Sequence, residues 1–410
     1  MGALVFGMHS ISTLRAMPHR SNGCWRGVEL PSESGEELAS IACRGRSFPS
    51  VGYQMRQSKA MGTLGKVAPA IMLLFTLCLS SATKAIADHK PPSCIDTPPY
   101  DTTPYKAERF VRVAPGVKLE VLDWGGSGEV MVLLTGSGDN AHVFDYFAFQ
   151  FTNYFHVIGI TRRGWLPSSQ PKNGYDVETR ATDDIKVLDA LGIKEAVFVA
   201  HSIAGSELSK IAVKYPSYVD KLVYLDAYDL SERNTFPDVP SPFDLITDAD
   251  ARSIFTFQAA YARLLGVREP IMPICLSFAF DKDGIVTGTS APDSIIAQLA
   301  DGVNTPQNPP THWADIKAPR LGIVAPPTVE GKLPWYSYLS PADQAVFDER
   351  FPRLLQWYSD VIDKFAEKHP GNPPPEVYLL PGAPHYVYIN NETEVVRQMR
   401  KFLGLPVGGN

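Results

Sequence analysis

From about residue 108 onward, runs of apolar residues alternate with amphipathic segments. Residues 111–113 and 118–122 alternate apolar with polar positions around Pro115-Gly116, which is typical of a half-exposed β-hairpin. Later runs are almost wholly apolar, as strands buried on both faces need to be. These runs cover 130–134, 156–160, 196–200, 222–225, 321–324 and 377–380.

Helical patterns lie between these runs. Residues 177–191 place Ile185, Leu188 and Leu191 on one face, and Gly192 is suited to end that helix. Further helices are predicted over 203–215, 341–369 and 392–403. Because strands alternate with helices, we expect an α/β fold with a mostly parallel sheet covered on both faces. A mixed, Pro-rich interval at about 230–316 interrupts this alternation.

Composition narrows the classes of function. The chain has 410 residues, of which 44% are apolar and 20% charged, so it can bury a sizeable core. Its net charge of −6, with no basic run, argues against a nucleic-acid partner. The five cysteines form no CxxC pair and no HExxH occurs, so no metal or other cofactor is expected. A single long apolar segment argues against a multi-span membrane protein.

That segment, Val67–Leu79, has the features of a secretory signal. Basic residues precede it and small residues follow it, ending in Ala85-Ile86-Ala87. We interpret 55–87 as a signal peptide cleaved after Ala87, which predicts an exported protein, periplasmic or secreted, without stable membrane insertion after cleavage. The alternative is a buried core helix. Cleavage would leave a Pro-rich linker over 88–107 and a domain over about 108–404.

Residues 1–54 show no sustained helical or strand period. We interpret them as a disordered upstream extension ahead of a working start at Met55 or Met61, with an organelle transit peptide as the alternative. Two of the five cysteines, Cys94 and Cys275, lie beyond the predicted cleavage site. An exported compartment permits a disulfide between them, and two free thiols agree with the sequence equally well.

Residues 199–205, VAHSIAG, lead from a buried strand straight into a helix, with Ser202 at the corner. A sharp turn of this kind exposes the serine hydroxyl above the sheet and needs small neighbours two positions away on either side. Those neighbours are Ala200 and Ala204, where the usual motif has glycine. Ser202 is therefore a candidate nucleophile, and a plain helix N-cap is the alternative.

A serine nucleophile needs a base and an oxyanion hole. His385 follows the last apolar run in the turn Pro381-Gly-Ala-Pro and precedes the final helix, so it is the candidate base. The N–H of Ile203, directly after the serine, is the natural first oxyanion donor. A second donor is expected after the 130–134 strand, where the glycines around Ser137 let the backbone approach a ligand closely, so we choose the Ser137 N–H.

These features together resemble the α/β-hydrolase superfamily over about residues 108–404, and within it capped single-domain bacterial serine hydrolases of the esterase type. The resemblance rests on Gly136-Ser137 and Arg163-Gly164 after strands, on Ser202 at the elbow and on Gly382-Ala-Pro-His385. It implies an eight-stranded, mostly parallel sheet, with Ser202 after strand five, His385 after strand eight and a helical cap, about 230–316, inserted after strand six.

The acid of the triad departs from the pattern of that superfamily. Members commonly carry an Asp after strand seven, but residues 323–330 read IVAPPTVE and contain none. Asp226, at the end of strand six, is our first choice, because some members take their acid from that position. Glu330 and Asp229 remain alternatives. The acid would fix the tautomer of His385 and stabilise its charged form.

The sequence thus predicts an exported serine hydrolase that cleaves a small ester-like substrate through a Ser-His-Asp triad and an acyl-enzyme. A serine at the elbow, rather than an aspartate, argues against epoxide or haloalkane chemistry of the ester-intermediate type. The alternatives are a peptidase, an amidase or a C–C hydrolase with the same triad, or a non-enzymatic ligand-binding protein. Aromatic residues of the cap are candidates for an apolar pocket: Phe236, Phe243, Phe255, Phe257, Tyr261, Phe278 and Phe280.

Overall fold

The computed structural model describes residues 107–227, 238–247, 249–252, 254–267, 278–282, 285–289, 291 and 311–407. The predicted signal peptide, the segment before it, the pair Cys94 and Cys275, and Asp229 all lie outside these residues. Within the described part, no helix is both long enough and apolar enough to cross a membrane.

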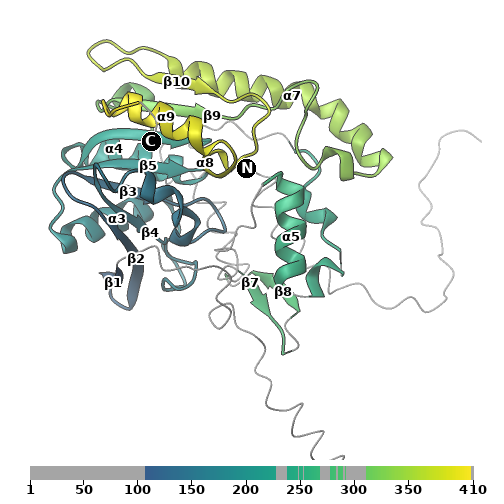
Figure 1. Cartoon of the computed structure of the whole chain (residues 1–410), viewed down its shortest axis with the longest axis horizontal. Helices are drawn as coiled ribbons and strands as arrows, with labels where there is room; N and C mark the ends of the chain where they lie inside the picture. Colours follow the sequence, from purple (N-terminus) through teal and green to yellow (C-terminus); the bar gives the residue numbers. More distant parts are fainter. Residues whose placement is uncertain are drawn as a thin grey trace, which may run out of the picture. The chain divides into compact units, whose positions relative to one another are not determined.

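An eight-stranded sheet forms the centre of the domain, in the order β1-β2-β4-β3-β5-β6-β9-β10 (Figure 1). β1 pairs antiparallel with β2, β2 pairs antiparallel with β4, and every later neighbour is parallel. The expected mostly parallel sheet is therefore confirmed. The strands are β1 (Ala107–Ala114), β2 (Val117–Gly125), β3 (Val130–Leu134), β4 (His156–Ile160), β5 (Ala196–His201), β6 (Val219–Leu225), β9 (Arg320–Val324) and β10 (Glu376–Leu379).

Alternate residues of the central strands enter two separate apolar cores, one on each face of the sheet. On β3, Met131 and Leu133 join one core, whereas Val132 and Leu134 join the other. Every residue of β5 is buried. The sheet is therefore covered on both sides, which explains why these strands read as continuous apolar runs in the sequence.

Helices from different parts of the chain cover the two faces. α3 (Val177–Leu191) and α4 (Ala204–Lys214) contribute to the core that contains Val132. The opposite core receives the short helices η1 (Ala141–Phe144), η2 (Phe147–Gln150) and α8 (Val387–Asn390), together with α9 (Glu392–Phe402) and most of the apolar face of α7 (Pro341–Ala366).

The bounds of these helices follow local capping chemistry. The Asp176 side chain accepts from Thr179 N at the start of α3, and Gly192 ends that helix at φ 74°. Ser340 caps α7 and is followed by Pro341 in the first turn. α7 ends at Ala366, three residues before the predicted end at His369, because Glu367 is already extended.

The insertion between β6 and β9 is not purely helical. It contains α5 (Ile254–Leu265) and also an antiparallel hairpin of β7 (Phe278–Phe280) and β8 (Val286–Thr289) that the sequence analysis did not predict. The turn is held by Asp281, whose backbone N–H donates to Ile285 O and whose carboxylate accepts from Ile285 N.

Several contacts join the insertion to the rest of the domain. Phe257 and Tyr261 on α5 lie in the same apolar core as Tyr388 of α8. Asn390 donates to Gly266 O at 2.6 Å, and Trp335 Nε1 donates to Pro240 O at 2.9 Å.

Candidate active site

The parallel strands β5, β6, β9 and β10 are neighbours, so the residues that follow their carboxyl ends meet at one edge of the sheet. Ser202 follows β5, Asp226 follows β6 and His385 lies in the turn after β10. Residues that are far apart in the sequence, such as Ser202 and His385, therefore lie at the same edge of the sheet.

Ser202 occupies a strained backbone position between β5 and α4. Its φ of 58° lies in the left-handed region that non-glycine residues rarely adopt. The flanking Ala200 and Ala204 are fully buried, as small residues at a tight strand-to-helix corner need to be. The Ser202 carbonyl accepts from Gly205 N at 3.0 Å, so the helix begins directly after the serine.

Asp226 and His385 form the closest polar contact at this edge. His385 Nδ1 lies 2.6 Å from Asp226 Oδ2, while Asp226 Oδ1 accepts from Ala325 N at 2.9 Å. The Asp226 N–H donates to Ile323 O at 2.7 Å. The carboxylate is buried and is fixed by β9 on one side, so it presents one oxygen to the imidazole in a defined direction.

The second imidazole nitrogen of His385 is available for chemistry. Among the described residues, its buried Nε2 has no hydrogen-bond partner. The His385 ring packs against His201 with centroids 4.6 Å apart, and His201 directly precedes Ser202. An imidazole held at Nδ1 by a carboxylate and free at Nε2 is the arrangement that a general base for a serine requires.

Of the other two candidate acids, Glu330 is described and is not in this arrangement. Glu330 is exposed, and it lies next to the short bridge between Thr328 and Lys332 in the β9–α7 connection. Asp229 lies outside the described residues. Of the two described carboxylates, Asp226 is the one that the structure places against His385.

The two predicted oxyanion donors follow two neighbouring strands, β5 and β3. Ile203 is fully buried at the start of α4, and Ser137 lies in the β3–η1 loop. Within the described part of the chain, neither backbone N–H donates to a protein acceptor. Gly136 allows the loop to approach β5 closely, because a Cβ there would lie 2.8 Å from His201 Nδ1.

A buried polar cluster beside the dyad was missed from the sequence. Tyr386 donates to both carboxylate oxygens of Asp139, at 3.1 and 3.2 Å, and Asp139 Oδ2 lies 3.9 Å from His201 Nδ1. Burial raises the pKa of Asp139 to about 7, although the Tyr386 hydroxyl and the nearby His385 act in the opposite direction. Burial, with a smaller effect from His385, holds the pKa of His201 well below its usual range, so that ring is neutral at pH 7.

The signals for these residues were present but ambiguous. His201 precedes the candidate Ser202, Asp139 lies two positions after the candidate Ser137, and Tyr386 follows the candidate His385. From the sequence alone they would be expected to be exposed, because polar residues in loops usually are. Only the fold shows that the three side chains are buried together.

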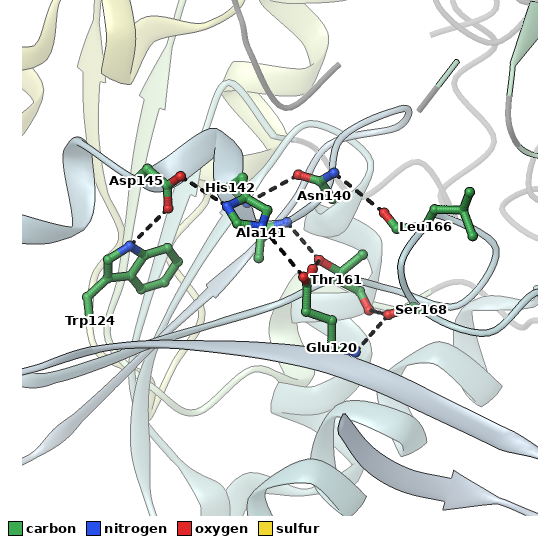
Figure 2. Close-up of polar contacts among 9 residues, drawn as sticks. All are labelled: Glu120, Trp124, Asn140, Ala141, His142, Asp145, Thr161, Leu166 and Ser168. Carbon is green, nitrogen blue, oxygen red and sulfur yellow. Dashed lines mark hydrogen bonds and ion pairs between the residues drawn. The ribbon is translucent and has the colours of Figure 1, made fainter. Parts of the chain in front are cut away.

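A second cluster, around His142 of η1, is shown in Figure 2. His142 Nδ1 lies 3.0 Å from Asp145 Oδ2, and its Nε2 lies 3.6 Å from Glu120 Oε1. Glu120 in turn accepts from the Thr161 hydroxyl, whose oxygen accepts from Ala141 N at 2.8 Å.

His142 carries a positive charge in this setting. Burial alone would lower its pKa, but the hydrogen bonds and charges of Asp145 and Glu120 outweigh burial and raise the pKa to about 10. Trp124 Nε1 donates to Asp145 Oδ1 at 3.1 Å, which ties the cluster to β2. The cluster therefore fixes the start of η1, immediately after the oxyanion loop.

The side chains of the predicted cap aromatics are described only in part. Phe257 and Tyr261 are buried on α5, with Tyr261 beside Tyr386. Phe236 lies outside the described residues, and of the other four only the backbone is described. That these aromatics line a substrate pocket therefore stays a prediction.

Comparison with known proteins agrees with this fold. A family model described as "Alpha/beta hydrolase family" matches residues 131–398. Epoxide hydrolase 3 of Mus musculus is 30% identical over 149 residues, which are 34% of this chain and 40% of that protein. The 2-(acetamidomethylene)succinate hydrolase of Mesorhizobium japonicum is 30% identical over 101 residues, 25% of this chain and 36% of the relative. The chain thus matches less than half the length of these curated relatives.

Solved structures extend the likeness to almost the full length of their chains. The structure of E-2-(acetamidomethylene)succinate hydrolase matches with a TM-score of 0.51 and 21% identity, covering 73% of this chain and 99% of that one. A bacterial membrane phospholipase A matches with a TM-score of 0.51 and 17% identity, covering 82% and 98%. At these identities the likeness is one of fold. With its sheet order, its strand-to-helix serine and the family match over residues 131–398, the chain belongs to the α/β-hydrolase family.

Proposed function

We propose that this protein is a serine hydrolase that cleaves a carboxylic ester through a covalent acyl-enzyme. The observation that carries the proposal is the Asp226–His385 contact of 2.6 Å, with His385 Nε2 unpartnered at the edge of the sheet where Ser202 stands. A histidine held in this way can take a proton from one direction only, and that is the requirement for activating a serine hydroxyl.

In the proposed reaction, Ser202 Oγ attacks the ester carbonyl carbon while His385 Nε2 takes the hydroxyl proton. The N–H groups of Ile203 and Ser137 stabilise the negative charge on the carbonyl oxygen. His385 then gives the proton to the departing alcohol, and the C–O bond to that alcohol breaks. A water molecule, deprotonated by His385, releases the acid and restores Ser202.

The nucleophile also separates this proposal from the activity named for one relative. Opening an epoxide through an enzyme-bound alkyl ester needs a carboxylate nucleophile, and residue 202 is a serine. The hydrolase of Mesorhizobium japonicum is named for a small molecule that is not an epoxide. That relative supports hydrolysis of a small molecule, but it does not identify the acyl group of the substrate.

Covalent labelling with a fluorophosphonate probe tests the proposal. The wild-type protein is expected to be labelled, and Ser202→Ala is expected to lose the label. Ser206→Ala is a matched control, because Ser206 is also buried and lies on α4, four residues after Ser202. Absence of labelling in the folded wild-type protein, or equal labelling of Ser202→Ala, would contradict the proposal.

Rates on p-nitrophenyl esters of increasing chain length, compared with aminoacyl p-nitroanilides, separate an esterase from a peptidase or amidase. We expect the esters to be cleaved faster, because the alcohol leaves more readily than an amine. Binding of an ester analogue without labelling or turnover would indicate a ligand-binding protein built on this fold.

We further propose that the protein is exported after cleavage at Ala87, on the basis of the apolar segment 67–79 and the small residues that follow it. N-terminal sequencing of the protein made by its host tests this. A mature chain that starts at Asp88 supports the proposal, and an intact N-terminal segment contradicts it.

A further inference from the structure

Arg162 is buried immediately after β4, and its guanidinium reaches the oxyanion loop. Nη1 donates to Gly136 O at 2.9 Å, and Nη2 donates to Thr135 O. The same side chain pairs with Glu207, with 3.2 Å between Nη2 and Oε1. Arg162 therefore holds two consecutive carbonyl groups of the loop that carries Ser137.

The hydrogen bond from Arg162 to Gly136 O also fixes the direction of the neighbouring Ser137 N–H. The carbonyl of Gly136 and the N–H of Ser137 belong to one peptide plane, and in a trans peptide the two groups point in opposite directions. The Gly136–Ser137 bond is trans, since the single cis bond among the described residues is Leu166–Pro167. When Arg162 binds the Gly136 carbonyl, the Ser137 N–H must therefore point away from Arg162.

The loop needs such a restraint because of its glycines. A Cβ at residue 136 would lie 2.8 Å from His201 Nδ1 and 2.9 Å from Asp139 Oδ2, so the close approach to β5 requires glycine. Gly138 follows with φ 89°. Glycine adopts both signs of φ readily, so a peptide next to it can turn over at low cost unless other groups hold it.

Glu207 links this restraint to the second donor. Glu207 lies in the first turn of α4, and Ile203, the other oxyanion donor, precedes that helix. The Arg162–Glu207 ion pair therefore connects the loop of Ser137 to the helix start of Ile203 inside the buried interior. A guanidinium can make these three contacts at once because its donors spread in one plane, whereas an ammonium acts as a point charge.

We propose that Arg162 is a positioning residue that locks the Gly136–Ser137 peptide with its N–H directed at the oxyanion site. This inference rests on the proposed acyl hydrolysis by Ser202. The buried Arg162–Glu207 pair would keep the oxyanion hole formed before the substrate binds. The peptide then does not need to turn over in order to stabilise the transition state.

The test compares Arg162→Lys with Arg180→Lys. Arg180 is a matched control because it is also buried and also pairs with Glu207, at 2.8 Å, but among the described residues it does not donate to Thr135 O or Gly136 O. Both substitutions should lower Tm. For Arg162→Lys we expect kcat to fall about 100-fold, near the loss of one oxyanion donor, with KM changed less than about threefold. For Arg180→Lys we expect kcat to stay within about threefold.

Inhibition by an alkyl boronic acid supplies a readout that a purely structural role would not change. The boronate forms a tetrahedral adduct with a serine and places an oxygen in the oxyanion hole, so its affinity should fall in parallel with kcat in Arg162→Lys alone. Equal kcat and equal boronate affinity in the two variants would overturn the inference.

A crystal structure of the wild-type protein with a phosphonate bound to Ser202 decides the matter even if Arg162→Lys fails to fold. We expect the phosphoryl oxygen to accept from the Ser137 and Ile203 N–H groups while the Gly136 carbonyl stays on Arg162. A Gly136 carbonyl turned away from Arg162 would overturn the inference. A wild-type protein that takes no phosphonate would instead contradict the proposed function itself.

Discussion

Asp226 and His385 are joined by a contact of 2.6 Å between Oδ2 and Nδ1, across 159 positions of sequence. The other carboxylate oxygen of Asp226 accepts from Ala325 N, so the side chain cannot rotate without losing a backbone hydrogen bond. This arrangement holds the imidazole by one nitrogen and leaves the other free among the described residues.

Asp226→Asn should lower kcat by roughly 10⁴-fold with little loss of stability. Because Oδ1 is held by Ala325 N, the new amide NH₂ would face His385 Nδ1 and force the proton onto Nε2, where the serine proton must be received. Ester turnover measures the effect. Glu330→Gln is the control, since Glu330 is exposed, and a comparable loss of kcat in that variant would argue against Asp226 as the acid.

Ser202→Gly should raise stability by about 1 kcal/mol while abolishing turnover, because glycine adopts φ of 58° without strain. Ser202→Ala should be equally inactive but should not gain this stability, since alanine keeps the Cβ. Denaturant unfolding of the two variants gives the comparison. If Ser202→Gly is no more stable than Ser202→Ala, the backbone at the elbow is not strained.

His142→Gln should cost stability in a pH-dependent way. The pKa of His142 is raised from 6.5 to about 10, so its charged form stabilises the fold fully below pH 6.5, and that contribution is lost as the pH rises through 10. The penalty of the substitution, a few kcal/mol, should therefore be largest at pH 6 and shrink towards pH 10. Urea unfolding at several pH values measures it, with exposed His312→Gln as the control. A penalty that does not vary between pH 6 and 10 would count against a charged His142.

Asp139→Asn should show a pH dependence of the same sign, in a lower pH range. Burial raises the pKa of Asp139 from 3.8 to about 7, against the effects of Tyr386, His385 and Arg162. The folded state then binds the proton more tightly than the unfolded state, so the wild-type protein loses stability as the pH rises from about 4 to about 7.

The asparagine does not titrate, so Asp139→Asn should gain stability relative to the wild-type protein over this window, by an amount on the order of 4 kcal/mol. Unfolding at pH 4.5, 5.5 and 7 measures the difference. Asp363→Asn removes an exposed carboxylate and serves as the control. A difference between Asp139→Asn and wild type that is the same at all three pH values would contradict the raised pKa.

Local pattern located the strands of the main sheet and its principal helices, and it supplied Ser202 and His385 as candidates. The apolar runs located the strands, and the capping residues Asp176 and Gly192 bounded α3 at the predicted positions. Ser202 and His385 could be chosen because each stands in a short motif directly after a buried strand. These signals are encoded within about ten residues, and such short-range preferences can be read without knowing the fold.

Other features of the site depend on contacts between distant segments, and only the tertiary structure decided them. It placed Asp226, rather than Glu330, against His385, because Asp226 directly follows β6 and is held by Ala325 N, whereas Glu330 is exposed in the connection beyond β9. It also buried Arg162 beneath the oxyanion loop and Tyr386 against Asp139, residues that in the sequence look like ordinary polar positions of loops. Burial changes the protonation and the hydrogen bonding of such groups, and burial is a property of the packed chain that no local pattern encodes.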